Sequence, residues 1–191
     1  MLRTLFSGLV VLALAYAALC AALFFFQRSL IYFPQPRSAG AAAQRIALPT
    51  PVGDGLATTR PSSGADALLY FGGNAEDVSL SLRGFAAAFP EHAIVLVHYR
   101  GYGGSAGSPS EAALIEDGLV WFDKVRAEHP NVTLVGRSLG SGVAVRVAAQ
   151  RSVARLVLVT PYDSLEDLAA SQFPMFPVRW LLRGERNSWI R

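Results

Sequence analysis

Cysteine and lysine are almost absent from this sequence, which has one of each, Cys20 and Lys124, in 191 residues. A single cysteine excludes an internal disulfide framework, and because Cys20 lies in an apolar N-terminal stretch, no thiol remains for chemistry elsewhere. The 17 basic residues exceed the 14 acidic ones, but they are dispersed along the chain. That distribution indicates a solvated surface and no nucleic-acid partner. Potential metal ligands do not cluster in the sequence either, so we expect no metal and no other cofactor.

Charged side chains are missing altogether from Leu5 to Phe26. A helix of these 22 residues reaches roughly 33 Å at about 1.5 Å per residue, enough to cross a hydrocarbon core of about 30 Å. We therefore predict one transmembrane helix and a single-pass membrane protein whose partner is the lipid bilayer, contacted through residues 5–26. Basic residues flank both ends of the stretch, so the side on which the remaining chain lies stays open.

A cleaved signal peptide is the alternative to this anchor. Arg3 supplies a positive start, and Ala15-Tyr16-Ala17 looks like a small-residue cleavage site. However, the apolar run continues past that site to Phe24-Phe25-Phe26, whereas the apolar region of a signal peptide ends after roughly 7–15 residues. The length of the run therefore favours an uncleaved anchor.

The sequence divides into three parts. Residues 1–33 are interpreted as the transmembrane anchor with an interfacial aromatic segment, residues 34–44 as a small-residue linker, and residues 45–191 as one folded domain. The composition, 52% hydrophobic and 16% charged, is too apolar for a disordered chain.

Apolar runs without polar alternation recur in the domain, a pattern typical of strands buried on both faces of a parallel sheet. They cover Ala67–Phe71, Ala93–His98, Val132–Val135 and Leu156–Thr160. Weaker strand signals occur at Arg45–Leu48 and Gly55–Thr59, between prolines. Helical patterns separate the strong runs, so we expect an α/β fold with right-handed crossovers.

Three helices are expected between the strands. Val78, Leu82, Phe85 and Phe89 form one apolar face. Ser108-Pro109-Ser110-Glu111 fits a capping box in which Ser108 caps the next helix. The third helix is expected at Leu139–Gln150, where small residues allow close packing on the sheet.

The segment Gly136-Arg137-Ser138-Leu139-Gly140 has the G-x-S-x-G pattern between an apolar strand and a helix. In a strand–turn–helix elbow this pattern holds the serine hydroxyl on a sharp, strained turn as a nucleophile. A tight turn with an incidental serine is the alternative. An acyl-transfer site also needs donors for the oxyanion. We expect one from the backbone N–H of Leu139 and a second from the loop containing Gly73 and Asn74, although that loop can also be a plain turn capped by Asn74.

The stretch from Gly101 to Ala106 formally matches the dinucleotide fingerprint G-x-G-x-x-G/A after a strand. In that fingerprint the helix opens within the glycines. Here the capping signal delays the helix to Ser108, which argues against nucleotide binding.

Five segments together support a family resemblance: residues 30–34, 72–75, 99–107, 136–140 and 160–164. They resemble the membrane-anchored α/β-hydrolases of the serine-aminopeptidase-like branch, which are related to the animal depalmitoylating hydrolases. The resemblance implies a mostly parallel α/β-hydrolase-type sheet flanked by helices, with Ser138 as the nucleophile. It implies that Gly73 or Asn74, together with Leu139, frames the oxyanion hole. The implied substrate is an ester, thioester or peptide.

Members of that family continue through two further strands, whose following loops hold the triad acid and the triad histidine. This sequence stops at Arg191, so the resemblance implies a C-terminally truncated domain that lacks the last two strands and both triad partners. The Leu156–Thr160 strand would then form an apolar sheet edge. The tail, Phe173–Leu182, is expected to be a helix packed on the sheet, with a role at the membrane surface as the alternative.

None of the three histidines follows Ser138 in the sequence. His92 and His129 precede strands and are expected at the opposite end of the sheet. His98 is at the correct end but two strands away, about 10 Å at roughly 4.8 Å per strand, beyond hydrogen-bond reach. Asp163 could serve as an acid, but an acid without an imidazole orients nothing.

Two functions remain open. The first is a membrane-tethered serine hydrolase impaired by the missing triad partners. The second is a non-catalytic, membrane-tethered binding module that keeps the elbow for structural reasons.

Overall fold

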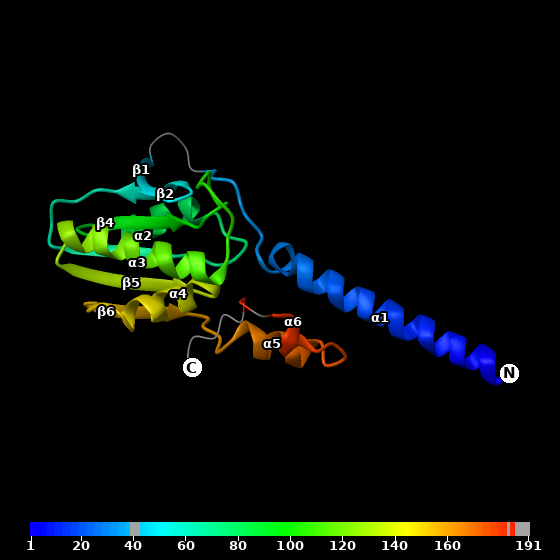
Figure 1. Cartoon of the computed structure of the whole chain (residues 1–191). Helices are drawn as coiled ribbons and strands as arrows, with labels where there is room; N and C mark the ends of the chain where they lie inside the picture. The colour runs from blue at the N-terminus through cyan, green and yellow to red at the C-terminus, as the bar shows by residue number, and fades with distance from the viewer. Residues whose placement is uncertain (39–42, 183, 186–191) are drawn as a thin grey trace.

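The computed structural model describes residues 1–38, 43–182, 184 and 185, and its first element is a long helix that projects from the body (Figure 1). Helix α1 runs from Leu2 to Ile31, longer at both ends than the predicted span, and it is long and apolar enough to cross a bilayer. Its half-buried residues recur every three or four positions on its C-terminal half, so one face of that half contacts the rest of the protein. These residues are Cys20, Leu23, Gln27 and Ile31.

A mixed sheet of six strands in the order β1-β2-β4-β3-β5-β6 forms the body. The strands are β1 Gln44–Thr50, β2 Gly53–Arg60, β3 Asp66–Phe71, β4 Ala93–His98, β5 Asn131–Arg137 and β6 Arg155–Val159. The hairpin β1–β2 joins β4 in antiparallel fashion, whereas β4, β3, β5 and β6 are parallel. Strand β1 begins inside the predicted linker 34–44, of which residues 39–42 lie outside the described residues.

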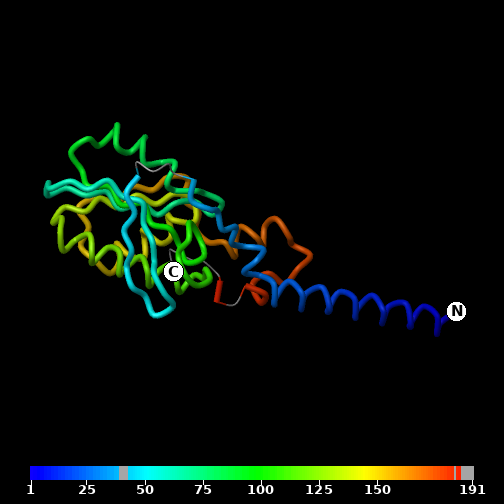
Figure 2. Tube along the Cα trace, turned by 90° about the horizontal axis from the view of Figure 1, so that it is seen from above, coloured from blue at the N-terminus to red at the C-terminus, as the bar shows by residue number. Residues whose placement is uncertain are grey.

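Helices cover the two faces of the parallel strands, as Figure 2 shows from above. Helix α3 (Glu111–Glu128) and α4 (Leu139–Ala148) share one apolar cluster with the sheet, while η1 (Val78–Ser81) and α2 (Leu82–Ala88) pack on the other. Because successive strand residues point to opposite faces, Leu69 and Phe71 belong to the first cluster and Leu68 and Tyr70 to the second. The carboxyl ends of these strands all lie at the edge that faces α1 (Figure 1).

The start of α3 differs from the prediction. Ser110 is its N-cap and accepts a hydrogen bond from the Ala113 amide at 3.2 Å, so the expectation that Ser108 caps this helix is wrong. Ser110 has an extended backbone, φ −157° and ψ 160°, which keeps Pro109 outside the helix. The amide of Glu111 donates to the Glu185 carboxylate at 3.0 Å. A residue of the tail therefore satisfies one of the backbone donors at the N-terminus of α3.

Strand β6 is not buried on both faces as its sequence suggests. Its four apolar side chains are 36–41% exposed, because β6 is the edge of the described sheet, although α4 contacts it. These residues are Leu156, Val157, Leu158 and Val159. The predicted apolar edge is therefore present in the described structure.

The tail does not pack on the sheet. Helix α5 (Leu165–Gln172) and the short helix α6 (Val178–Leu181) contact each other, and α6 contacts α1. Figure 1 shows both beside the C-terminal half of α1. The expectation of a sheet-packed helix at Phe173–Leu182 is therefore wrong: Phe176 stacks on Tyr16 of α1 instead, and Val178 and Leu182 are buried. Glu185 helps to hold this arrangement, since it is buried and bound by Arg28 at 2.7 Å and by the Tyr32 hydroxyl at 2.7 Å.

Candidate active site

Ser138 occupies the turn between β5 and α4, and its backbone is strained. Its φ is 49° and its ψ −115°, a region that residues other than glycine rarely adopt. The Ser138 amide donates to the Val159 carbonyl at 2.9 Å, and its carbonyl accepts bonds from the Ser141 amide at 2.9 Å and hydroxyl at 2.5 Å. Hydrogen bonds on both sides therefore hold this turn.

The glycines on either side of Ser138 are required by close backbone approach. A Cβ on Gly140 would lie 2.0 Å from the Phe71 carbonyl oxygen, and one on Gly136 would lie 2.5 Å from the Gly140 carbonyl oxygen. The Gly140 amide also donates to the Gly72 carbonyl at 3.1 Å. The elbow is thus pressed against the end of β3, and Ser138 remains half-exposed in a pocket of about 580 Å³.

Backbone amides from two loops lie around this pocket. Because β3 pairs with β5, the loop after β3 begins beside Ser138, and a Cβ on Gly73 would lie 3.9 Å from the Ser138 Cβ. The Gly73 amide already donates to Glu76 at 2.7 Å. Within the described residues, no acceptor is recorded for the amides of Asn74 or Leu139. Asn74 lines the pocket and Leu139 directly follows Ser138, so these two N–H groups stay candidates for an oxyanion site.

Glu76 is a site residue that the sequence interpretation missed. Its carboxylate, 13% exposed, accepts hydrogen bonds from the Gly73 amide at 2.7 Å, the Tyr70 hydroxyl at 2.8 Å and the Ser81 hydroxyl at 3.2 Å, and lies 3.4 Å from Arg137. Burial and the bond to Glu76 raise the pKa of the Tyr70 phenol well above its usual value. An acid three residues after Gly73 was the available signal, because that spacing lets a side chain return to a turn amide.

Asn74 does more than cap a turn. Its side-chain amide donates to the carbonyl of Ile31, the last residue of α1, and its oxygen accepts from the Phe33 amide at 3.1 Å and the Tyr102 hydroxyl at 2.8 Å. The loop beside Ser138 is therefore hydrogen-bonded to Ile31, the last residue of α1, and to Phe33, which follows the helix.

His98 lies away from Ser138. It is buried on β4, two strands from β5, and its Nε2 is 2.8 Å from the Thr58 hydroxyl. Burial disfavours the imidazolium and lowers the pKa of His98 to about 4. A Cβ on Gly103 would lie 2.1 Å from its Nδ1, so the glycine-rich loop packs directly on the ring.

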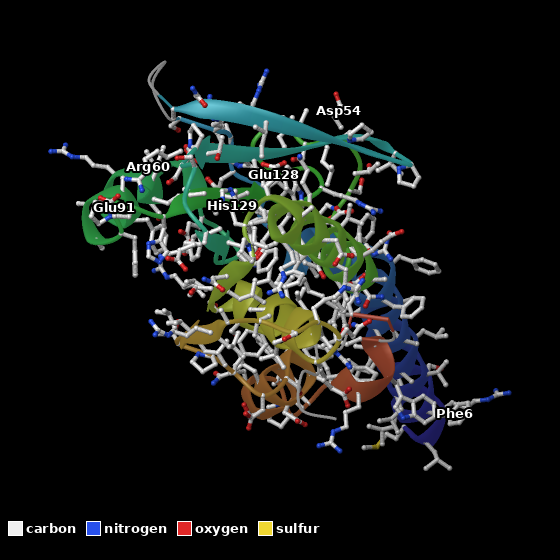
Figure 3. All side chains as sticks on the ribbon, turned by 90° about the vertical axis from the view of Figure 1, so that its left-hand side faces the viewer. Phe6, Asp54, Arg60, Glu91, Glu128 and His129 are labelled. Carbon is white, nitrogen blue, oxygen red and sulfur yellow. The ribbon has the colours of Figure 1, made fainter. Side chains whose placement is uncertain are left out.

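The remaining histidines lie at the other end of the sheet, which Figure 3 views with His129 labelled. His129 follows α3 and its Nδ1 is 2.8 Å from the Gly64 carbonyl, and His92 precedes β4. Asp163 is exposed in the loop after β6. No described group of three or more His, Cys, Asp or Glu residues could hold a metal ion.

The glycine-rich loop also lacks the geometry of a dinucleotide site. The next helix, α3, begins only at Glu111. The Gly103 amide donates to the Gln35 carbonyl at 2.9 Å, and the Ser105 hydroxyl donates to the His98 carbonyl at 2.8 Å. The loop therefore serves as a structural support between β4 and the segment after α1.

Comparison with known proteins gives a consistent picture. Residues 66–188 match the family described as the alpha/beta hydrolase fold. The chain is 35% identical over 176 residues to the uncharacterized protein Rv2307c of Mycobacterium tuberculosis, covering 82% of this chain and 61% of that protein. It is 36% identical over 121 residues to bovine lysophosphatidylserine lipase ABHD12, covering 58% and 30%, respectively. The chain thus spans less than two thirds of the length of each relative.

Solved structures agree at the level of the fold. A soluble variant of the monoglyceride lipase of Saccharomyces cerevisiae superposes with a TM-score of 0.58 at 15% identity, covering 71% of this chain and 50% of that one. The Pyrococcus furiosus esterase PF2001 gives 0.57 at 15% identity, covering 80% and 65%. The expected fold class, an α/β-hydrolase-type sheet flanked by helices and preceded by one apolar helix, is confirmed.

Proposed function

Because the chain belongs to the α/β-hydrolase fold family, we propose that it is a membrane-tethered serine hydrolase-type protein that acts on an acyl ester, thioester or peptide carbonyl through Ser138. The observation that carries the proposal is the strained turn of Ser138 (φ 49°) beside two backbone amides, those of Leu139 and Asn74, without a recorded acceptor among the described residues. In this arrangement the serine oxygen attacks the carbonyl carbon and the two N–H groups stabilise the oxyanion.

The proposed tether is α1, whose apolar length matches a bilayer. Its end is bonded to the Asn74 loop, so the pocket of Ser138 would open close to the membrane surface. Relatives named for the hydrolysis of lipid esters support an acyl-ester substrate, since one of them is a lysophosphatidylserine lipase.

The general base is the part of the proposal that these residues do not supply. His98 is buried on β4 and bound to Thr58, and His92 and His129 lie at the opposite end of the sheet. Removing the histidine of a serine triad reduces turnover by about 10⁶-fold in one well-studied protease. We therefore propose that residues 1–191 are impaired alone and that an imidazole from further polypeptide completes the site.

The test uses chemical replacement of the missing base. The full chain in lipid nanodiscs is treated with a fluorophosphonate probe with and without added imidazole. We expect imidazole to accelerate labelling of Ser138 by about ten-fold, less than the 10²–10⁴ that a positioned base contributes. Ser138→Ala should abolish the labelling. Ser63→Ala is the control, because Ser63 is exposed between β2 and β3 and its loss should leave labelling intact.

A non-catalytic binding module remains the second candidate, favoured by the distance of every histidine from the elbow. It predicts no labelling of Ser138 at any imidazole concentration while the protein remains folded. That result would overturn the hydrolase proposal.

A further inference from the structure

A second pocket lies between α1 and the tail, outside the site of Ser138. Its volume is about 430 Å³, and Gln27 is the one polar residue among those described as lining it. Leu19 and Leu23 contribute from the side of α1, and Ala169 and Phe173 from the side of α5. We call this pocket the tail groove.

The tail reaches far along α1. The Tyr16 hydroxyl donates to the Met175 carbonyl at 2.7 Å, and the Tyr16 ring stacks on Phe176 with centroids 6.1 Å apart. Tyr16 lies 15 residues before the end of α1 at Ile31, a distance of roughly 22 Å along the helix. It is also near the middle of the uncharged stretch 5–26, so a helix that crosses a bilayer would carry Met175 and Phe176 into the hydrocarbon region.

The turn between α5 and α6 has the surface and the backbone for such a depth. Phe173, Met175 and Trp180 expose 56%, 72% and 74% of their surface, which is unfavourable in water and favourable in lipid. Pro174 and Pro177 remove two backbone donors, and the Tyr16 hydroxyl satisfies the Met175 carbonyl. Few unsatisfied backbone groups are tolerated inside a bilayer, and these residues reduce their number.

The tail groove ends next to the catalytic pocket. Ile31 lines the groove, and its carbonyl accepts a hydrogen bond from the side chain of Asn74. Asn74 lines the pocket that contains Ser138. The tail groove and the pocket of Ser138 therefore lie on the two sides of the contact between Ile31 and Asn74. A ligand that lies along α1 can thus present its polar end near Ser138.

We infer that the tail groove binds one acyl chain of a membrane lipid and holds the carbonyl end of that lipid towards Ser138. The inference rests on the proposed function for the position of α1 in the bilayer. The volume lies within the range of about 300–1,000 Å³ of small-molecule sites. A flexible alkyl chain suits this groove beside a membrane helix, because all of its described lining residues except Gln27 are apolar.

Photocrosslinking of lipid tests the inference without requiring catalysis. The full chain is placed in phosphatidylcholine nanodiscs that contain a lysophosphatidylcholine with a diazirine on its acyl chain, and the crosslinks are mapped by peptide mass spectrometry. We expect crosslinks at Leu23 and Phe173 to exceed those at Leu12, which lies outside the groove on the same helix, by about five-fold.

Filling the groove should remove this preference. Ala169→Trp fills it from α5 and should reduce crosslinking at Leu23 by about five-fold. Leu23→Trp fills it from α1 and should give the same loss at Phe173, which guards against a misfolded first variant. Ala22→Trp is the matched control, because Ala22 is exposed on the same helix and does not line the groove.

Two results would overturn the inference: equal crosslinking along α1, as for lipid around any anchor, or equal effects of the Ala169 and Ala22 variants. Fluorophosphonate labelling of Ser138 with imidazole is measured on the same samples. Labelling without a groove preference refutes only the groove, whereas a groove preference without labelling refutes the catalytic proposal and leaves lipid binding in place.

Discussion

The carboxylate of Glu76 accepts a hydrogen bond from the backbone amide of Gly73 at 2.7 Å. This bond fixes the turn that leads to Asn74, which lines the pocket of Ser138. It also holds a negative charge near the point where an oxyanion would form, and like charges in proximity are unfavourable. In the proposed reaction at Ser138, Glu76 would therefore favour a rigid loop at the expense of transition-state electrostatics.

Replacing Glu76 by glutamine should separate these effects. Glu76→Gln retains an acceptor for the Gly73 amide but removes the charge, so we expect imidazole-assisted labelling of Ser138 to become about two- to five-fold faster. The bonds from Tyr70 and Ser81 lose their charged acceptor, so the free energy of unfolding should fall by about 1–2 kcal/mol. Labelling rates and urea unfolding measure the two outcomes.

Asp66→Asn is the control for this substitution. Asp66 is exposed at the other end of β3, where its carboxylate accepts a hydrogen bond from Asn131 at 3.0 Å. Its loss should leave labelling unchanged. Slower labelling of the Glu76→Gln protein would contradict the electrostatic role assigned to Glu76.

Gly140 should tolerate no side chain. The Cβ of Gly140→Ala would meet the Phe71 carbonyl oxygen at 2.0 Å, and backbone cannot move aside as a side chain can, so we expect a loss of at least about 3 kcal/mol or failure to fold. Gly84→Ala in α2 is the matched control, since nothing lies within 4 Å of its Cβ. It should gain up to about 1 kcal/mol from helix propensity. Thermal unfolding distinguishes the two, and equal melting temperatures would refute the close packing of the elbow.

The strain at Ser138 predicts a gain in stability when the nucleophile is removed. Ser138→Gly suits a φ of 49° and should stabilise the protein by about 1 kcal/mol relative to Ser138→Ala, which keeps the strained backbone. Both variants lose labelling, so the comparison isolates the backbone. Equal unfolding free energies for the two variants would show that the turn is relaxed.

His98 should make stability depend on pH. Its pKa of about 4 in the folded protein is below the value of about 6.5 of an unfolded imidazole. The folded state therefore binds fewer protons between these values, so stability is fully present above about pH 6.5 and decreases as the pH falls towards 4. The loss is at most about 3.5 kcal/mol, because the two pKa values differ by about 2.5 units at about 1.4 kcal/mol per unit.

Urea unfolding followed by the fluorescence of the buried Trp121 measures this dependence at pH 7.5 and pH 5. His98→Gln can keep a hydrogen bond to Thr58 and should flatten the difference between the two pH values. His129→Gln, at the other end of the sheet, should retain it. If the His129 variant, and not the His98 variant, lost the difference in stability between the two pH values, the assignment of the effect to His98 would be wrong.

Local sequence patterns were sufficient to predict the strands of the sheet and the elbow at Ser138. The strand at β5, the glycines around Ser138 and the helix α4 are adjacent in sequence, so their chemistry can be interpreted together. The distance of His98 from Ser138 also followed from the usual strand order. The start of α3 could not be predicted from Ser108, because the donor at Glu111 is satisfied by Glu185, 74 residues away.

Long-range contacts account for the features that the sequence did not reveal. The path of the tail depends on the bond between Tyr16 and Met175, separated by 159 residues, and no periodicity indicates such a partner. The link between Asn74 and Ile31 spans 43 residues. Asn74 was therefore interpreted only as an oxyanion donor or as the cap of a turn, although its side chain forms the connection to α1.

If α1 spans a bilayer as proposed, the hydrogen bond between Asn74 and Ile31 makes the loop beside Ser138 sensitive to the thickness of that bilayer. A helix longer than the local hydrocarbon layer accommodates the excess by tilting, and a tilt of α1 would pivot its last residue, Ile31. Since Asn74 is hydrogen-bonded to both Ile31 and Phe33, this movement would also displace the loop beside Ser138. Membranes with shorter or longer lipid tails would then change the shape of the proposed oxyanion site, with no ligand and no change in the sequence.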